Sequence, residues 1–296
     1  MITKNYRIAI FIILSVLSGV VFYRESIAQI FSVVIHREGS SHGIFVPFLS
    51  LYFLWLQYDK LKKTELKTHF QGVGLMIAGL VFPVLGIGSF HIQFMGFIVL
   101  VAGLVLLMFG REVFNHTAFP LFFLVTMIPI PPNIYEALAN YSRHISFGGS
   151  LELISLFGIP FFRDGWLIQL QNALLEVVES CSGIRYLISY FVFGIAYAYI
   201  TRENNWKRVL IVVLTIPISH FASIWRLTII FVMTHHFGPF WSEHRPHVVL
   251  SWGLFAAVLL AAIAIDQFLL NSKYQIINNK QIAIPNVQNS KQKTKI

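Results

Sequence analysis

Apolar runs recur along this chain, and each is close to the length of about 20 residues that a helix needs to cross a bilayer. The runs predict eight membrane spans, at residues 7–23, 43–57, 72–90, 93–110, 116–131, 182–200, 208–233 and 247–270. The expected fold class is therefore all-α, a polytopic integral membrane protein.

Composition agrees with a chain that lives in lipid. Hydrophobic residues make up 56% and charged residues only 12%, against roughly 25% charged in an ordinary soluble domain. A net charge of +9 would suggest nucleic acid as the partner of a soluble protein. Here the Lys and Arg residues lie mainly in short loops between apolar runs, so they indicate topology, and no nucleic acid partner is expected.

The basic residues divide unevenly between the two sides of the membrane. With the N-terminus inside, the cytoplasmic segments carry Lys4, Arg7, Lys60, Lys62, Lys63, Lys67, Arg111, Arg202, Lys207, Arg208 and five tail lysines. The other face carries Arg24, Arg37, Arg143, Arg163 and Arg245. The positive-inside rule therefore predicts that both termini are cytoplasmic.

This orientation places residues 24–42, 132–181 and 234–246 on the outer face. In the long middle segment, Ile134 to Phe157 has helical apolar spacing, and Trp166 to Gln171 alternates like a short strand. The first span is expected to stay uncleaved because no small-residue cleavage site follows it. Residues 1–271 are predicted to form one membrane domain, and residues 272–296 a disordered polar tail.

The single cysteine, Cys181, excludes an internal disulfide and stands just before the apolar run from Tyr186 to Ile200. A lone thiol in a membrane helix is often only a small apolar residue. If a helix starts near Cys181, its N-terminal amides favour the reactive thiolate; if it starts near Asn172, that argument fails.

Arg226 lies inside the seventh predicted span, about 12 Å below residue 234 if the helix is regular. A charge at such depth is costly and marks a functional site unless the side chain snorkels to the surface. Its fixed fork of donors suits an oxyanion or a carboxylate.

His247 follows Pro246 and opens the eighth predicted span at the outer face. A helix N-terminus disfavours the imidazolium, which leaves a neutral ring able to accept a proton. The surrounding histidines match no metal motif, so neither a metal nor a cofactor is expected. No G-x-S-x-G sequence occurs, which argues against a serine hydrolase.

Cys181, Arg226 and His247 fall in the outward halves of three consecutive spans. A thiol nucleophile, an oxyanion donor and a base are the groups that acyl transfer requires.

These residues resemble the exosortases and archaeosortases of the PEP-CTERM protein-sorting systems. The similarity includes Ser41-His42-Gly43 with Pro47, Ile128-Pro129-Ile130-Pro131, Cys181-Ser182-Gly183, Arg226 and His247, in that order. Family members often carry Asn shortly before the arginine, where this chain has His220-Phe221-Ala222-Ser223.

The resemblance implies a cysteine transpeptidase in the bacterial cytoplasmic membrane with its active site facing the outside. Its substrates would be exported proteins that carry a C-terminal motif, a membrane helix and a basic cluster. Cys181 would be the nucleophile, His247 the base and acid, and Arg226 the oxyanion holder. Substrate-binding roles fall to Arg185, His42, Ser182 and Ser223, and the partners are membrane lipid and an acceptor nucleophile of unknown identity.

Two alternatives stay open. A transporter or channel would bind an anionic solute through Arg226, although the sequence shows no internal repeat. A cell-envelope polysaccharide acyltransferase would share the topology and the thiol chemistry.

Overall fold

The computed structural model describes residues 23–36, 40–85, 89–179, 182–242, 249, 251–264 and 266–267. The predicted first span, apart from residue 23, and the polar tail 272–296 lie outside these residues. The chain divides into two compact units, one of residues 1–141 and 184–213 and the other of residues 142–183 and 214–296.

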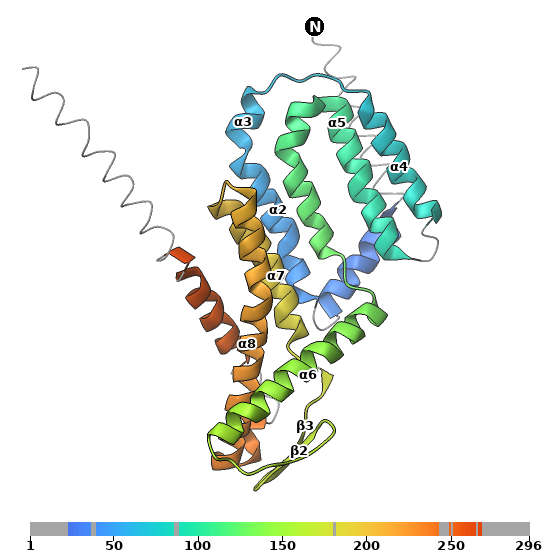
Figure 1. Ribbon diagram of the computed structural model, residues 1–296. Coiled ribbons are helices and arrows are strands. Elements are labelled where there is room, and N and C mark those ends of the chain that lie inside the picture. The colour runs from blue at the N-terminus through green and yellow to red at the C-terminus, as the bar shows by residue number, and fades with distance from the viewer. Residues whose placement is uncertain are drawn as a thin grey trace, which may run out of the picture. The chain divides into compact units, whose positions relative to one another are not determined.

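The described elements of the first unit are all helices (Figure 1). Residues 23–36 form a helix. It is followed by η1 (Ser41–Ile44), α2 (Phe45–Leu56), α3 (Tyr58–Lys63), α4 (Gln71–Leu85), α5 (Phe90–Phe123) and η2 (Leu124–Met127). The start of α6 (Pro132–Leu156), all of α7 (Ile184–Thr201) and the start of α8 (Asn205–Phe237) complete it.

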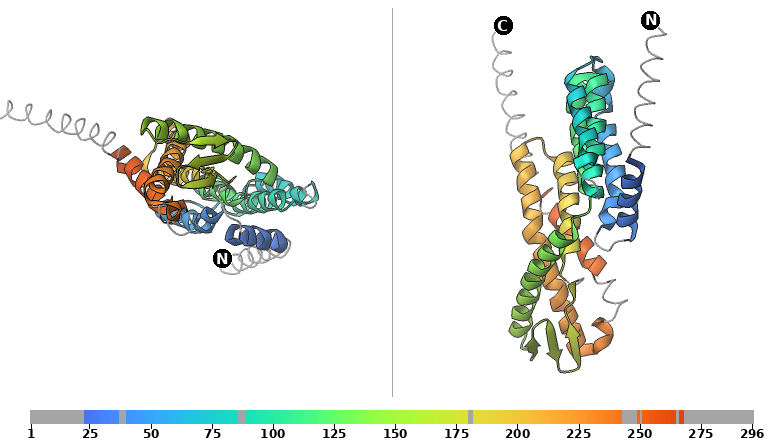
Figure 2. Two further views of the ribbon diagram at one scale, coloured as in Figure 1. Left: turned by 90° about the horizontal axis from the view of Figure 1, so that it is seen from below. Right: turned by 90° about the vertical axis from the view of Figure 1, so that its right-hand side faces the viewer.

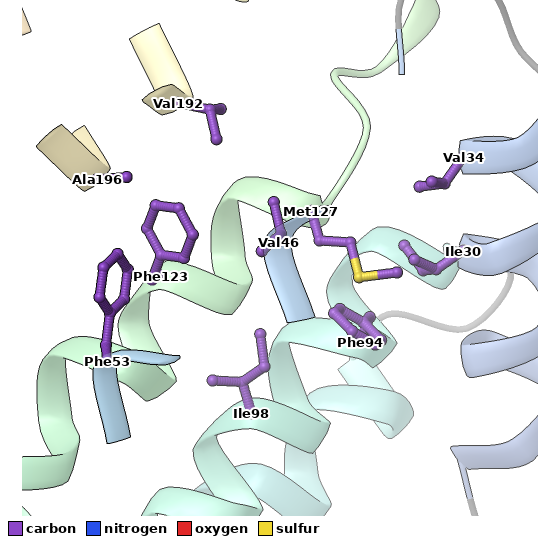
Figure 3. Packing of buried hydrophobic residues seen from close by; sticks show 10 residues of the cluster. All are labelled: Ile30, Val34, Val46, Phe53, Phe94, Ile98, Phe123, Met127, Val192 and Ala196. Carbon is purple, nitrogen blue, oxygen red and sulfur yellow. The ribbon is translucent and has the colours of Figure 1, made fainter. Parts of the chain in front are cut away.

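The core of this unit joins the helix 23–36 to α2, α5 and α7. Its buried members, drawn in Figure 3, are Ile30, Val34, Val46, Phe53, Phe94, Ile98, Phe123, Met127, Val192 and Ala196. Phe53 meets Phe123 edge-on at 5.1 Å between ring centroids, and Phe119 stacks on Tyr199 at 3.6 Å. Ser50 of α2 also donates a hydrogen bond of 2.8 Å to the Pro120 carbonyl.

Helix α5 is two antiparallel segments that meet at Gly110. The backbone there has φ 86 and ψ 179, which no helix contains, and a Cβ would lie 2.1 Å from the Lys67 carbonyl oxygen. Glycine alone accepts both conditions. The fourth predicted span ended at residue 110 and the fifth began at residue 116, so the break lies where the sequence predicts a separation.

Helix α4 packs against the first half of α5 at backbone contact, and Figure 2 shows the two side by side. A Cβ at Gly79 would lie 2.7 Å from the Leu100 amide nitrogen, and one at Gly103 would lie 2.6 Å from that of Met76. Small residues allow membrane helices to approach this closely, which strengthens dispersion contacts between them.

The second unit contains most of α6, a small sheet, the C-terminal part of α8 from Leu214, η4 (Pro239–Ser242) and the helix Ser251–Ala264. The sheet is an antiparallel meander of β1 (Phe162–Asp164), β2 (Leu167–Leu170) and β3 (Ala173–Glu176). The core between them contains Phe147, Leu151, Ile154, Ile159, Ile168, Leu170, Val177, Leu227 and Phe231.

The sheet corrects the all-α prediction to a predominantly helical fold. The predicted helix from Ile134 and the predicted strand from Trp166 are both present, as α6 and β2. The flanking strands carried no strand signal, because β1 is exposed along its length and Ala173-Leu174-Leu175-Glu176 has helix-forming residues. Pairing with β2 overrides that local preference.

Among the described residues, three helices are long and apolar enough to cross a bilayer: Phe90–Met127, Ile184–Thr201 and Asn205–Phe237. Shorter apolar helices lie at His42–Leu56, Gln71–Phe82 and Ser251–Ala264. The predicted fifth span ran to residue 131, but the helical part ends at Met127, because the prolines beyond it cannot continue a helix.

Candidate functional site

The chain turns sharply at Gly183, just before α7 begins. Gly183 has a φ of 81, a left-handed conformation that favours glycine, and α7 begins at the next residue, Ile184. Asn172 precedes a strand rather than a helix, so the alternative helix start near Asn172 is wrong. Cys181 and Ser180 lie outside the described residues, which resume at Ser182.

This turn is packed tightly against α8. A Cβ at Gly183 would lie 2.0 Å from Ser223 Oγ and 2.7 Å from its Cβ. Ser223 is buried, and its hydroxyl donates to the Ser219 carbonyl at 2.9 Å. From α6, the Ser146 hydroxyl donates to the carbonyl of the buried Ser182 at 3.3 Å. The residues that follow Cys181 are therefore held between α6 and α8.

Arg226 lies three residues beyond Ser223 on α8 and is 2% exposed. Residues spaced by three share a helix face, so Arg226 lies on the face of α8 that contacts Gly183. Its burial within the protein removes the alternative that the side chain snorkels to the membrane surface. Leu227 and Phe231 pack with α6 and the sheet. The apolar run after Arg226 thus forms a protein core, which hydropathy cannot distinguish from a lipid-facing surface.

His220 and Ser223, which precede Arg226 on α8, differ in their contacts. The Nδ1 atom of His220 lies 2.9 Å from the Ile216 carbonyl, and Nε2 lies 3.4 Å from the Ser142 hydroxyl of α6. With Nδ1 as donor, Nε2 accepts from the hydroxyl. His220 therefore joins α8 to α6, whereas Ser223 contacts the turn after the cysteine.

His42 belongs to the other unit, where it lines a cavity of about 160 Å³. One wall is Ser40 and His42, and another is the segment 128–130. Ile188, Phe191 and Val192 of α7 close it. The motif around His42 and the motif around Pro129 are far apart in the chain, but both line this cavity.

Arg185 is in the first turn of α7, partly buried. It precedes Ile188 by three residues and Val192 by seven, so it lies on the helix face that lines the cavity. Thr126 and Tyr135 also line the cavity, and sequence reasoning did not select them. Their position beside the Ile-Pro-Ile-Pro segment was the only available signal.

Two sequence-predicted residues have no described surroundings. His247 lies outside the described residues, as does Cys181. The histidine-rich loop that begins at His235 is described only as far as Ser242. Within the described part of the chain, no three His, Cys, Asp or Glu side chains are grouped to hold a metal ion.

Comparison with known families gives one match over most of the chain. The profile of the transmembrane exosortases matches residues 34–264, which include Cys181, Arg226, His247 and both walls of the cavity. Comparisons with curated proteins and with solved structures give no match. The chain therefore belongs to the transmembrane exosortase family, as a membrane-embedded protein-sorting enzyme of the peptidase or transpeptidase type.

Proposed function

We propose that this exosortase is a cysteine transpeptidase that cleaves the C-terminal sorting signal of exported proteins and transfers them to an acceptor. The nucleophile is Cys181, the oxyanion holder is Arg226, and the base and acid is His247. Membership of the family supports the class of enzyme, and the packing of the turn after Cys181 supports this choice of residues.

The observation that carries the proposal is the packing of Gly183 on Ser223, one helical turn before the buried Arg226. A guanidinium shielded from water interacts with developing negative charge far more strongly than one in solution. It stays charged, and its donors have a fixed geometry that matches an oxyanion or a carboxylate. Such a group beside the cysteine segment suits acyl transfer.

In the proposed reaction, His247 takes the proton of the Cys181 thiol, and the resulting thiolate attacks the carbonyl carbon of the scissile peptide bond. The carbonyl oxygen becomes an oxyanion that Arg226 stabilises. The C–N bond then breaks, and the leaving amine takes a proton from His247. The product is a thioester, and an incoming amine or water, deprotonated by His247, attacks it and releases the thiolate.

The proposed substrates carry a short motif, a membrane helix and a basic cluster at their C-terminus, and the substrate helix would meet the enzyme in lipid. Chemistry takes place on the outer side of the bacterial cytoplasmic membrane. Helix α8 supports this orientation, because its N-terminal end lies among Arg202, Lys207 and Arg208. In this proposal residues 1–271 form the enzyme, and 272–296 a disordered cytoplasmic tail.

The test compares Cys181→Ala, Cys181→Ser and Arg226→Gln in cells that also produce a protein with such a signal. We expect Cys181→Ala to abolish processing on a gel, and Arg226→Gln to slow it by about a hundredfold or more, the usual effect of losing an oxyanion donor. Arg24→Gln is the control, since that side chain is 73% exposed. Detergent gel filtration checks that each variant folds.

Other outcomes would point to the alternatives. Unchanged processing by Cys181→Ala would refute the thioester mechanism. If Cys181→Ala left anion uptake into vesicles unchanged while Arg226→Gln abolished it, the chain would be a transporter. A lipid rather than a peptide trapped on Cys181 would indicate an acyltransferase.

A further inference from the structure

The loop that lines the cavity of the first unit packs closely against the core. Next to His42, a Cβ at Gly43 would lie 2.8 Å from Val34 and 3.6 Å from Met127, so this loop is pressed onto the core. Val34, Met127 and the cavity residue Val192 are all members of that core. Walls anchored this way give a preformed site, as ligand pockets usually are.

The size of the cavity limits what enters it. A volume of about 160 Å³ is close to that of an engineered cavity of about 150 Å³ that holds benzene. One ring or one branched aliphatic side chain fills such a space, whereas a helix does not fit.

The lining is almost entirely apolar, from Ile128, Pro129 and α7. Ser40, His42, Thr126 and Tyr135 also line the cavity, but little of their polar surface is exposed in it, and the Thr126 hydroxyl donates to the Phe123 carbonyl at 2.7 Å. An apolar lining around a space of this size suits one apolar side chain of a peptide.

One wall of the cavity comes soon after the cysteine in the sequence. Ile188 comes seven residues after Cys181, in the second turn of α7. Arg185, between them, shares the helix face of Ile188.

From these observations we infer that the cavity is a specificity pocket, which binds one apolar side chain of leucine size or smaller from the substrate's sorting motif. This inference rests on the proposed function and adds to it the class of residue that the enzyme reads. Ile188 is one of the residues that line this pocket, so its size affects the space left for the substrate side chain.

The experiment alters the size of the pocket and determines which motifs the enzyme then processes. Ile188→Ala enlarges the pocket and Ile188→Phe fills it; Ile200→Ala and Ile200→Phe are controls on the same helix, where Ile200 is 48% exposed. Each variant is produced with a reporter whose segment before the membrane helix is randomised, and processed members are sequenced. Gel filtration in detergent confirms that each variant folds.

We expect one motif position to change. The unaltered enzyme accepts residues up to leucine there, Ile188→Ala also accepts Phe, and Ile188→Phe accepts only Ala and Gly. Each shift should be tenfold or more, since about tenfold is the smallest usual effect of one methylene in an apolar pocket. The Ile200 variants should select the same motifs as the unaltered enzyme.

Identical motifs from both Ile188 variants and the unaltered enzyme would overturn the inference. So would an equal loss of every motif in folded Ile188 variants, which would show a purely structural role. Cys181→Ala, tested with the same library, separates the two hypotheses. If it stops processing while the Ile188 variants change nothing, the pocket assignment fails and the proposed function stands; if it still processes, the cysteine mechanism fails by itself.

Discussion

At the scale of single residues, the turn after Cys181 requires a glycine at position 183. Gly183 combines a left-handed backbone with a distance that leaves no room for a Cβ beside Ser223. Gly183→Ala should therefore reduce both the yield of folded protein and processing. The backbone strain alone costs about 1–2 kcal/mol, and the clash with Ser223 adds to it.

A double variant separates the two causes. Ser223→Gly removes the two atoms that would lie within 3 Å of the new Cβ, so Gly183→Ala with Ser223→Gly should melt at a higher temperature than Gly183→Ala alone. Thermal melting in detergent is the measurement, and Gly148→Ala serves as a control because a Cβ there would meet nothing within 4 Å. Additive losses would mean that the two residues are not coupled.

At this scale, the sequence identified the candidate chemical groups but not the residues that hold them in place. Arg226 could be selected because a charge within an apolar run is visible in the sequence. Ser146, which binds the Ser182 carbonyl, could not, because a serine in an amphipathic helix carries no sign of the partner it will meet.

At the scale of elements, the α4–α5 pair depends on glycines at particular helix faces. Gly79 faces the α5 backbone, whereas a Cβ at Gly74 of the same helix would meet nothing within 4 Å. We expect Gly79→Ala to lower the melting temperature in detergent, because overpacking costs about 1–3 kcal/mol. Gly74→Ala should leave it unchanged or raise it, since alanine favours a helix interior by about 0.5–1 kcal/mol. Equal effects of the two substitutions would contradict the close packing.

The elements also show which features of the fold cannot be predicted from the local sequence. Helix boundaries followed hydropathy, glycine and proline, so α7 and the break in α5 were predicted to within a few residues. Strands β1 and β3 were missed because their pairing with β2 is a tertiary event, and their own residues do not favour a strand.

At the scale of the whole molecule, the orientation in the membrane is the property to test. In a Cys181→Ala background, single cysteines at Asp164 and at Lys62 occupy segments predicted to lie on opposite sides. A membrane-impermeant maleimide added to spheroplasts should label Asp164→Cys at once. Lys62→Cys should react only after permeabilisation, because the basic segment around it is predicted to be cytoplasmic.

The reverse labelling pattern would show that the topology is inverted. The proposed chemistry would then not lie on the outer face. Labelling of both sites in intact spheroplasts would contradict the predicted placement of the 58–67 segment. Either result leaves the family assignment intact, because that rests on the sequence match.

The sequence by itself determined that this chain lies in a membrane, roughly where its helices run, and which cysteine, arginine and histidine are candidates for chemistry. Those properties are local, since hydropathy, helix breakers and a charge in an apolar run need only a short window. The tertiary structure alone decided that Gly183 packs on Ser223, and that His42, the 128–130 segment and α7 enclose one cavity. Such contacts join residues far apart in the chain, and they depend on backbone approach and side-chain shape, which no single segment encodes.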